Sequence, residues 1–93
     1  MSLGVLTGEL IRAGRALCRI DQAELARTAG LSVETVKRLE RFRGPVEATT
    51  RTVNALVNAF QECGVMFDDQ PGMGLGLRFR EPPAEQERRR AHG

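Results

Sequence analysis

The sequence contains no tryptophan, no tyrosine and a single histidine, and its only aromatic rings belong to four phenylalanines. Sites for single-stranded nucleic acid stack bases on aromatic side chains, so this scarcity argues against RNA binding by an aromatic sheet. Leu, Val and Ala must supply most of the core, which favours helices. At 93 residues the chain suits one small domain and excludes a two-domain enzyme.

Metal ligands and reactive side chains are also scarce. Cys18 and Cys63 lie far apart in the sequence, and the one histidine is His92. These residues match no familiar zinc spacing, and we expect reduced cysteines, although a disulfide is geometrically possible. No nucleophile stands beside a base. We therefore predict no metal site, no cofactor and no enzymatic activity.

Long apolar runs are missing too. No stretch approaches the roughly 18 to 20 apolar residues that cross a bilayer. The N-terminal residues lack the basic-then-apolar pattern of a secretory signal. We expect a cytoplasmic protein with no membrane partner.

Four amphipathic segments, each preceded by a capping residue, predict four helices. Glycines follow three of them, and a glycine just past a helix readily takes the left-handed conformation that ends it. The predicted helices are 8–19 after Thr7, 22–29 after Asp21, 33–42 after Ser32, and 51–63 after Thr49 or Thr50.

After Gly64 the apolar period changes from 3.6 residues to two, which predicts a β-hairpin over 65–80. Residues 81–93 contain two prolines and no large apolar residue, so we expect a disordered tail. The predicted fold class is mainly α: a small bundle of four or five helices followed by a C-terminal hairpin.

The segment from Gln22 to Arg41 predicts a helix, a tight turn at Gly30 and a second helix, a pattern typical of a helix-turn-helix. Ala26 is small where two steeply crossing helices need close approach. More closely, residues 10–60 resemble the phage-repressor/Cro (Xre) family. The matching residues are Arg15, Gln22, Leu25-Ala26, Gly30-Leu31-Ser32, Thr35-Val36, Leu39-Glu40 and Ala59-Phe60.

The resemblance implies a lambda-repressor-like fold with helix 33–42 in the major groove of double-stranded DNA. The residues support this separately, because at about 100° per residue Val36 and Leu39 mark a buried side and the opposite side is charged. A charged side can also be simply a solvated one. The predicted DNA-binding residues are Gln22, Ser32, Val33, Glu34, Lys37, Arg38, Arg41 and Arg43.

The predicted roles differ. Gln22 resembles the family's phosphate-contacting glutamine, or it simply begins a helix. Val33 could touch a thymine methyl group, and Glu34 could accept from cytosine N4. Arg38 suits guanine O6 and N7, with a phosphate contact as the alternative. Phosphate contacts are also assigned to Lys37, Arg41 and Arg43.

Arg15 and Glu40 match a pair that forms a buried ion pair in the family and ties the first helix to the recognition helix. On the helical wheel, Glu40 falls toward the core edge. We predict a structural role for this pair.

These features divide the chain into a helix-turn-helix domain at 1–64, the hairpin at 65–80 and the tail at 81–93. Because a lone two-stranded hairpin is only marginally stable, it must pack on something. It either joins two copies of the chain or folds back on its own helices as a monomer. We predict a homodimer through the apolar face Val65, Phe67, Leu75, Leu77 and Phe79.

The predicted function is sequence-specific binding of double-stranded DNA by a bacterial or phage transcription regulator associated with the nucleoid. The net charge of +2 is modest, but residues 1–51 hold nine basic against six acidic residues. The alternative is an antitoxin or adaptor that uses the same scaffold to bind an unidentified protein. The glycines at 72, 74 and 76 are not expected to cradle phosphate, because no helix follows them.

Overall fold

The computed structural model describes residues 6–70 and 74–79, which form four helices and a two-stranded antiparallel sheet. This is the predicted fold class, a small helical bundle with a C-terminal hairpin. The predicted tail and the tip of the hairpin lie outside the described residues. The elements are α1 (Gly8–Cys18), α2 (Gln22–Ala29), α3 (Val33–Glu40), α4 (Thr50–Glu62), β1 (Val65–Gln70) and β2 (Gly74–Phe79).

Each helix begins at a side-chain cap. The cap oxygen accepts a hydrogen bond, 2.8 to 3.2 Å long, from the backbone N–H three residues later. Gly30 ends α2 with φ 71°, as the sequence predicts, whereas α1 ends at a non-glycine residue in the same region, Arg19 with φ 58°. The four caps are Thr7, Asp21, Ser32 and Thr49.

The prediction that the third helix extends to Phe42 is wrong, because α3 ends at Glu40. Beyond Glu40 the backbone hydrogen bonds change from the i→i−4 pattern of an α-helix to an i→i−3 pattern. The Arg41 N–H donates to the Arg38 carbonyl at 3.2 Å, and the Phe42 N–H donates to the Leu39 carbonyl at 3.3 Å. The chain therefore leaves the helix through a tightened last turn.

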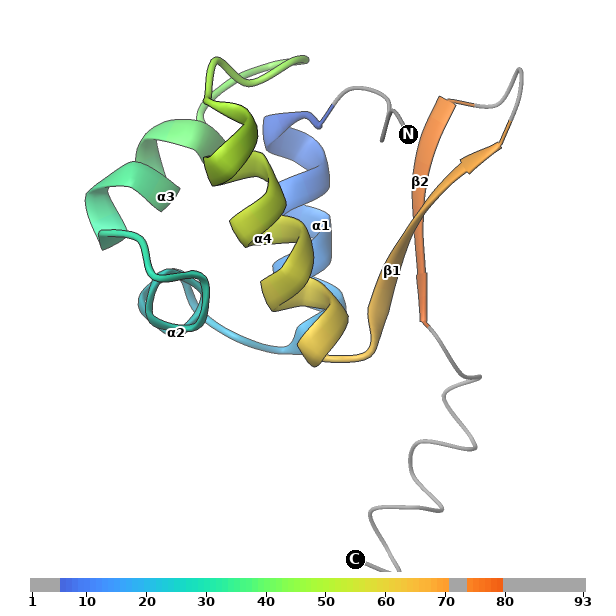
Figure 1. Cartoon of the computed structure of the whole chain (residues 1–93), viewed down its shortest axis with the longest axis horizontal. Coiled ribbons are helices and arrows are strands. Elements are labelled where there is room, and N and C mark those ends of the chain that lie inside the picture. The colour runs from blue at the N-terminus through green and yellow to red at the C-terminus, as the bar shows by residue number, and fades with distance from the viewer. Residues whose placement is uncertain (1–5, 71–73, 80–93) are drawn as a thin grey trace, which may run out of the picture.

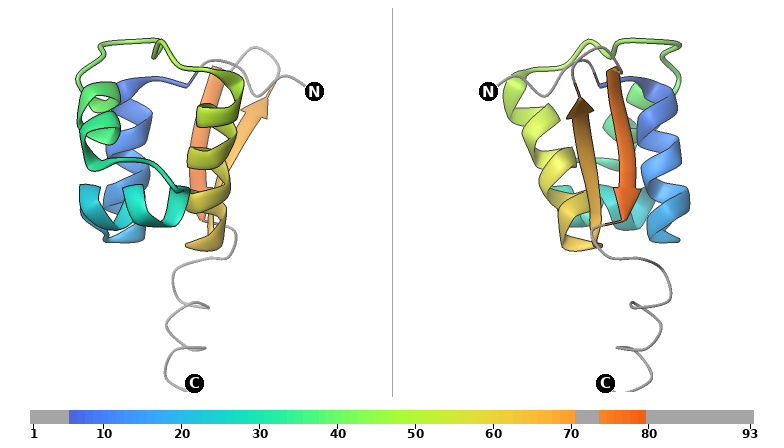
Figure 2. Two further views of the ribbon diagram at one scale, coloured as in Figure 1. Left: turned by 60° about the vertical axis from the view of Figure 1, so that its left-hand side comes forward. Right: turned by 90° about the vertical axis from the view of Figure 1, so that its right-hand side faces the viewer.

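The molecule is layered (Figure 1): α1 and α4 lie in the middle, α2 and α3 pack on one side, and the hairpin covers the other. Figure 2 shows β1 running beside α4 and β2 beside α1. The pair α2–α3 therefore faces away from the hairpin. The largest fully buried side chains, which join these layers, are Ile11, Leu25, Val36, Leu39, Leu56, Phe60 and Val65.

The loop between α3 and α4 is clamped to the start of α1. The Val46 N–H donates to the Leu6 carbonyl at 3.0 Å, and the Gly8 N–H donates to the Gly44 carbonyl at 3.2 Å. In return, the Gly44 N–H donates to Glu9 Oε1 at 3.0 Å, which lowers the pKa of the Glu9 carboxyl. The exit from α3 is therefore held in place by α1.

Candidate nucleic-acid interface

The two sides of α3 differ as predicted. Val36 and Leu39 have no exposed surface, whereas the charged side chains on the other side are exposed. The predicted DNA-binding residues that are exposed are the N-cap Ser32, then Glu34, Lys37 and Arg38 on the helix, and Arg41 and Arg43 just after it. The helix-turn-helix thus presents a charged surface, and four of these residues are cationic.

The first turn of α3 is partly committed to the fold. Ser32 Oγ accepts from the Thr35 N–H at 3.1 Å and lies 2.9 Å from Thr35 Oγ1. Val33 is half-buried and packs against the core. Two residues here were predicted to contact bases. Glu34 is exposed, whereas only the exposed part of the Val33 side chain could contact a base.

Gln22 begins α2, as expected, and its side chain has a partner within the fold. Its Nε2 donates to Glu40 Oε1 at 3.0 Å, and the residue is half-buried. A phosphate contact would have to use the second Nε2 hydrogen or the backbone N–H at the start of α2. Sequence reasoning missed this bond, because it depends on how α2 and α3 meet in space.

The Arg15–Glu40 ion pair predicted from the sequence is present. Arg15 Nε lies 2.5 Å from Glu40 Oε2, and Arg15 Nη2 donates to Oε1 at 3.0 Å. The Glu40 side chain is only 5% exposed. The hydrogen bond to Glu40 raises the pKa of Arg15 above its already high ordinary value, so the guanidinium group stays charged.

Two further hydrogen bonds from arginines of α1 were not predicted from the sequence. Arg12 Nη1 donates to the backbone carbonyl of Glu40, and Arg15 Nη1 donates to the Ile20 carbonyl at 3.2 Å. Arg12 and Arg15 are three residues apart on one helix, and this spacing indicates that both side chains lie on the same face. Side chains of α1 therefore hold both the α1–α2 connection and the end of α3 in place.

A pocket opens where α3 ends, between Arg38, Arg41 and Phe42, with a volume of about 250 Å³. Arg38 and Arg41 are exposed, and Phe42 is half-buried against the core. Arg41 Nε donates to the Lys37 carbonyl at 3.3 Å, which leaves its terminal nitrogens for other partners. The pocket lies on the same charged surface as the predicted contacts.

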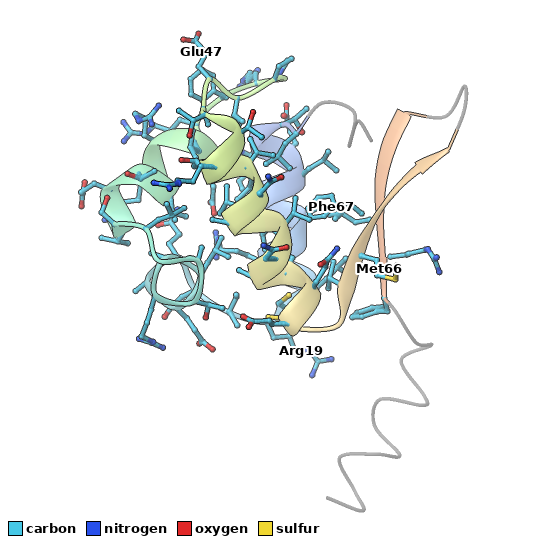
Figure 3. All side chains as sticks on the ribbon, in the orientation of Figure 1. Arg19, Glu47, Met66 and Phe67 are labelled. Atoms are coloured by element: carbon cyan, nitrogen blue, oxygen red, sulfur yellow. The ribbon has the colours of Figure 1, made fainter. Side chains whose placement is uncertain are left out.

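The hairpin face predicted to join two chains packs on the chain's own helices. The Phe67 ring lies 5.7 Å from the Phe60 ring, and Leu77 and Phe79 pack against the core. The prediction is wrong for Val65, which has no exposed surface and cannot reach a partner. Phe67 points toward the helices and Met66 away from them (Figure 3). The Leu75 side chain lies outside the described part.

Within the described ranges, no group of three His, Cys, Asp or Glu residues could hold a metal ion, and no helix is long and apolar enough to cross a membrane. Cys18 and Cys63 are free thiols, each half-buried. Burial raises the pKa of Cys18 to about 12, and a hydrogen bond with Cys63 contributes to the shift.

Comparison with known proteins adds no relative. No protein-family model matches the chain, and no curated protein is detectably similar to it.

Proposed function

We propose that this chain binds double-stranded DNA with sequence preference, as a transcription regulator resembling the phage-repressor/Cro (Xre) family. One observation carries the proposal: Lys37, Arg38 and Arg41 share the exposed side of α3, while Val36 and Leu39 anchor its other side with no exposed surface. A helix anchored this firmly can present cations to a polyanion without losing its packing.

The dimensions of α3 support the same function. An α-helix such as α3, about 10–12 Å in diameter with its side chains, fits a major groove about 12 Å wide. The α2–α3 pair faces away from the hairpin, so the hairpin does not cover it. At its start, α2 offers backbone N–H groups to a phosphate. Such a regulator would act in the cytoplasm, on the nucleoid.

The direct test is selection of bound duplexes from a random pool, followed by titration of the enriched duplex at several salt concentrations. We expect an enriched sequence and a steep fall in affinity with salt, because each phosphate contact releases counterions. Weak binding with no enriched sequence would reject the proposal and favour the protein-binding alternative.

Charge-removing variants locate the surface. Lys37→Ala should lower the log–log salt slope by about one unit. Arg19→Gly is the matched control: it also removes one cation, at an exposed position with φ 58° that suits glycine, at the far end of α1 (Figure 3). Its salt slope should equal that of the parent. Equal losses in both variants would indicate binding without a defined surface.

We also propose that the chain binds DNA as a homodimer, with two α3 helices about 34–36 Å apart on a near-palindromic site. The inner face of the hairpin is occupied, so the partner would contact its outer face and strand edges, where Met66 lies (Figure 3). Sedimentation of the full chain should show a dimer that Met66→Lys weakens. A monomeric mass both free and on DNA would reject the dimer.

A further inference from the structure

The pocket at the end of α3 has an unusual combination of walls: two guanidinium groups and one aromatic ring. Arg38 and Arg41 are three residues apart, and the tightened last turn brings such positions onto one side of the helix. Phe42 follows directly, with one part of its side chain against the core and another part lining the pocket. The pocket is therefore positively charged along its rim and apolar along one wall.

The backbone around this pocket is fixed before any ligand arrives. A Cβ atom added at Gly8 would lie 2.1 Å from the Phe42 carbonyl oxygen, so α1 runs directly against the residue. The Gly8 N–H also donates to Gly44, two residues further on. A ligand would meet a preformed wall and would not have to order it.

The chemistry of these walls selects an anion that carries an apolar part. Glu40, the acidic residue nearest in sequence to the pocket, is 4% exposed and paired with Arg15, so its charge is already compensated. A guanidinium group binds phosphate oxygens through paired N–H donors, and an aromatic ring packs well on aliphatic C–H groups. One deoxyribose with its phosphate offers both, whereas a base edge offers no anion.

We propose that Arg38, Arg41 and Phe42 bind one deoxyribose-phosphate unit of the DNA backbone, with the sugar on Phe42 and the phosphate between the two arginines. The inference rests on the proposed DNA binding and assigns Arg38 to a phosphate, so that guanine is not its partner. Phe42 then sets the position of α3 along the groove, since a backbone contact fixes register without reading sequence.

The test uses the full chain and a set of duplexes of the enriched sequence, each with one phosphate replaced by a neutral methylphosphonate. The parent should lose about tenfold in affinity at the phosphate that fills the pocket. Arg41→Ala and Arg38→Ala should each bind the parent duplex less tightly and lose part of the sensitivity to that same replacement. Sensitivity unchanged in both variants would overturn the assignment.

Phe42 is tested separately by Phe42→Ala and Phe42→Leu, with thermal melting to follow folding. Phe42→Ala should weaken binding by about fourfold or more while leaving the salt slope unchanged, because an apolar contact releases no counterion. If Phe42→Ala melts early, Phe42→Leu retains an apolar side chain and should bind only slightly less tightly than the parent. Parent-like affinity in a folded Phe42→Ala would overturn the sugar contact.

Further outcomes distinguish a failure of this inference from a failure of the proposed function. If replacing thymine by uracil at one position abolishes the effect of Phe42→Ala, the ring contacts a thymine methyl group and the sugar assignment is wrong. If the parent binds no duplex, the proposed function itself fails. If the parent binds but every pocket variant behaves like it, only this inference fails.

Discussion

Gln22 and Glu40 meet through a 3.0 Å hydrogen bond, at the same carboxylate oxygen that accepts from Arg15. One buried carboxylate thus receives a side chain from α1 and another from α2 while it belongs to α3. Helices α1, α2 and α3 are therefore joined at this one carboxylate.

Removing the Glu40 carboxylate should make the folded protein less stable. We expect Glu40→Ala to lower the free energy of unfolding by about 3–5 kcal/mol, because the Arg15 charge loses its partner. Urea denaturation followed by circular dichroism measures the change. Glu34→Ala, at an exposed position on the same helix, should stay within about 0.5 kcal/mol of the parent. A Glu40→Ala variant that melts like the parent would contradict the role assigned to the pair.

Replacing Gln22 by glutamate tests how closely it approaches Glu40. Gln22→Glu puts a second carboxylate where the amide now donates, and should cost about 2–3 kcal/mol at pH 7. Because acidification protonates the introduced carboxyl group, this cost should shrink at pH 4.5. Gln22→Ala is the control, with a cost of about 1 kcal/mol that hardly changes with pH. A pH-independent cost for Gln22→Glu would place the two side chains apart.

Gly8 should tolerate no side chain. An alanine Cβ there would lie 2.1 Å from the Phe42 carbonyl oxygen and 2.9 Å from that of Leu39, and backbone atoms cannot rotate away. We expect a loss of about 3 kcal/mol in unfolding free energy. Gly30→Ala meets no atom within 4 Å and should lose only about 1–2 kcal/mol, from its φ of 71° alone. Thermal melts of both variants should show this order, and the reverse order would contradict the close approach.

The Cys18 thiol predicts how stability changes in alkali. Its pKa in the folded state is raised from 9.0 to about 12, so the unfolded chain releases this proton at lower pH. The folded state should therefore lose stability as the pH rises from about 9 towards 12, and keep it in full below that window. Cys18→Ala should reduce the decline, measured as unfolding free energy at successive pH values. Identical pH profiles for variant and parent would show that Cys18 does not contribute.

The helices could be predicted because their signals are local. Capping residues such as Thr7 and Ser32 and the stop at Gly30 act within a few positions, and all three lie where expected. The end of α3 was placed too late because a tightened turn and a full turn look alike in sequence. The burial of Ile11, which has no exposed surface, depends on tertiary packing, because α1 is covered by both α3 and the hairpin.

The candidate site was predictable in part. The faces of α3 follow from periodicity, and the Arg15–Glu40 pair followed from a resemblance. The bond from Gln22 to Glu40 required the distance between two helices, which periodicity does not contain. Alternation in the hairpin identified an apolar face at Phe67, but whether that face covers its own helices or a second chain depends on tertiary packing.

The clamp between the start of α1 and the α3–α4 loop has a consequence for local unfolding. The bonds from Val46 to Leu6 and from Gly8 to Gly44 join residues that are 40 and 36 positions apart in the sequence. Neither segment can fray alone, because each holds the other's backbone groups. Their amide hydrogens should exchange with solvent deuterium at a common rate, as one cooperative unit that opens at the base of the pocket beside Phe42.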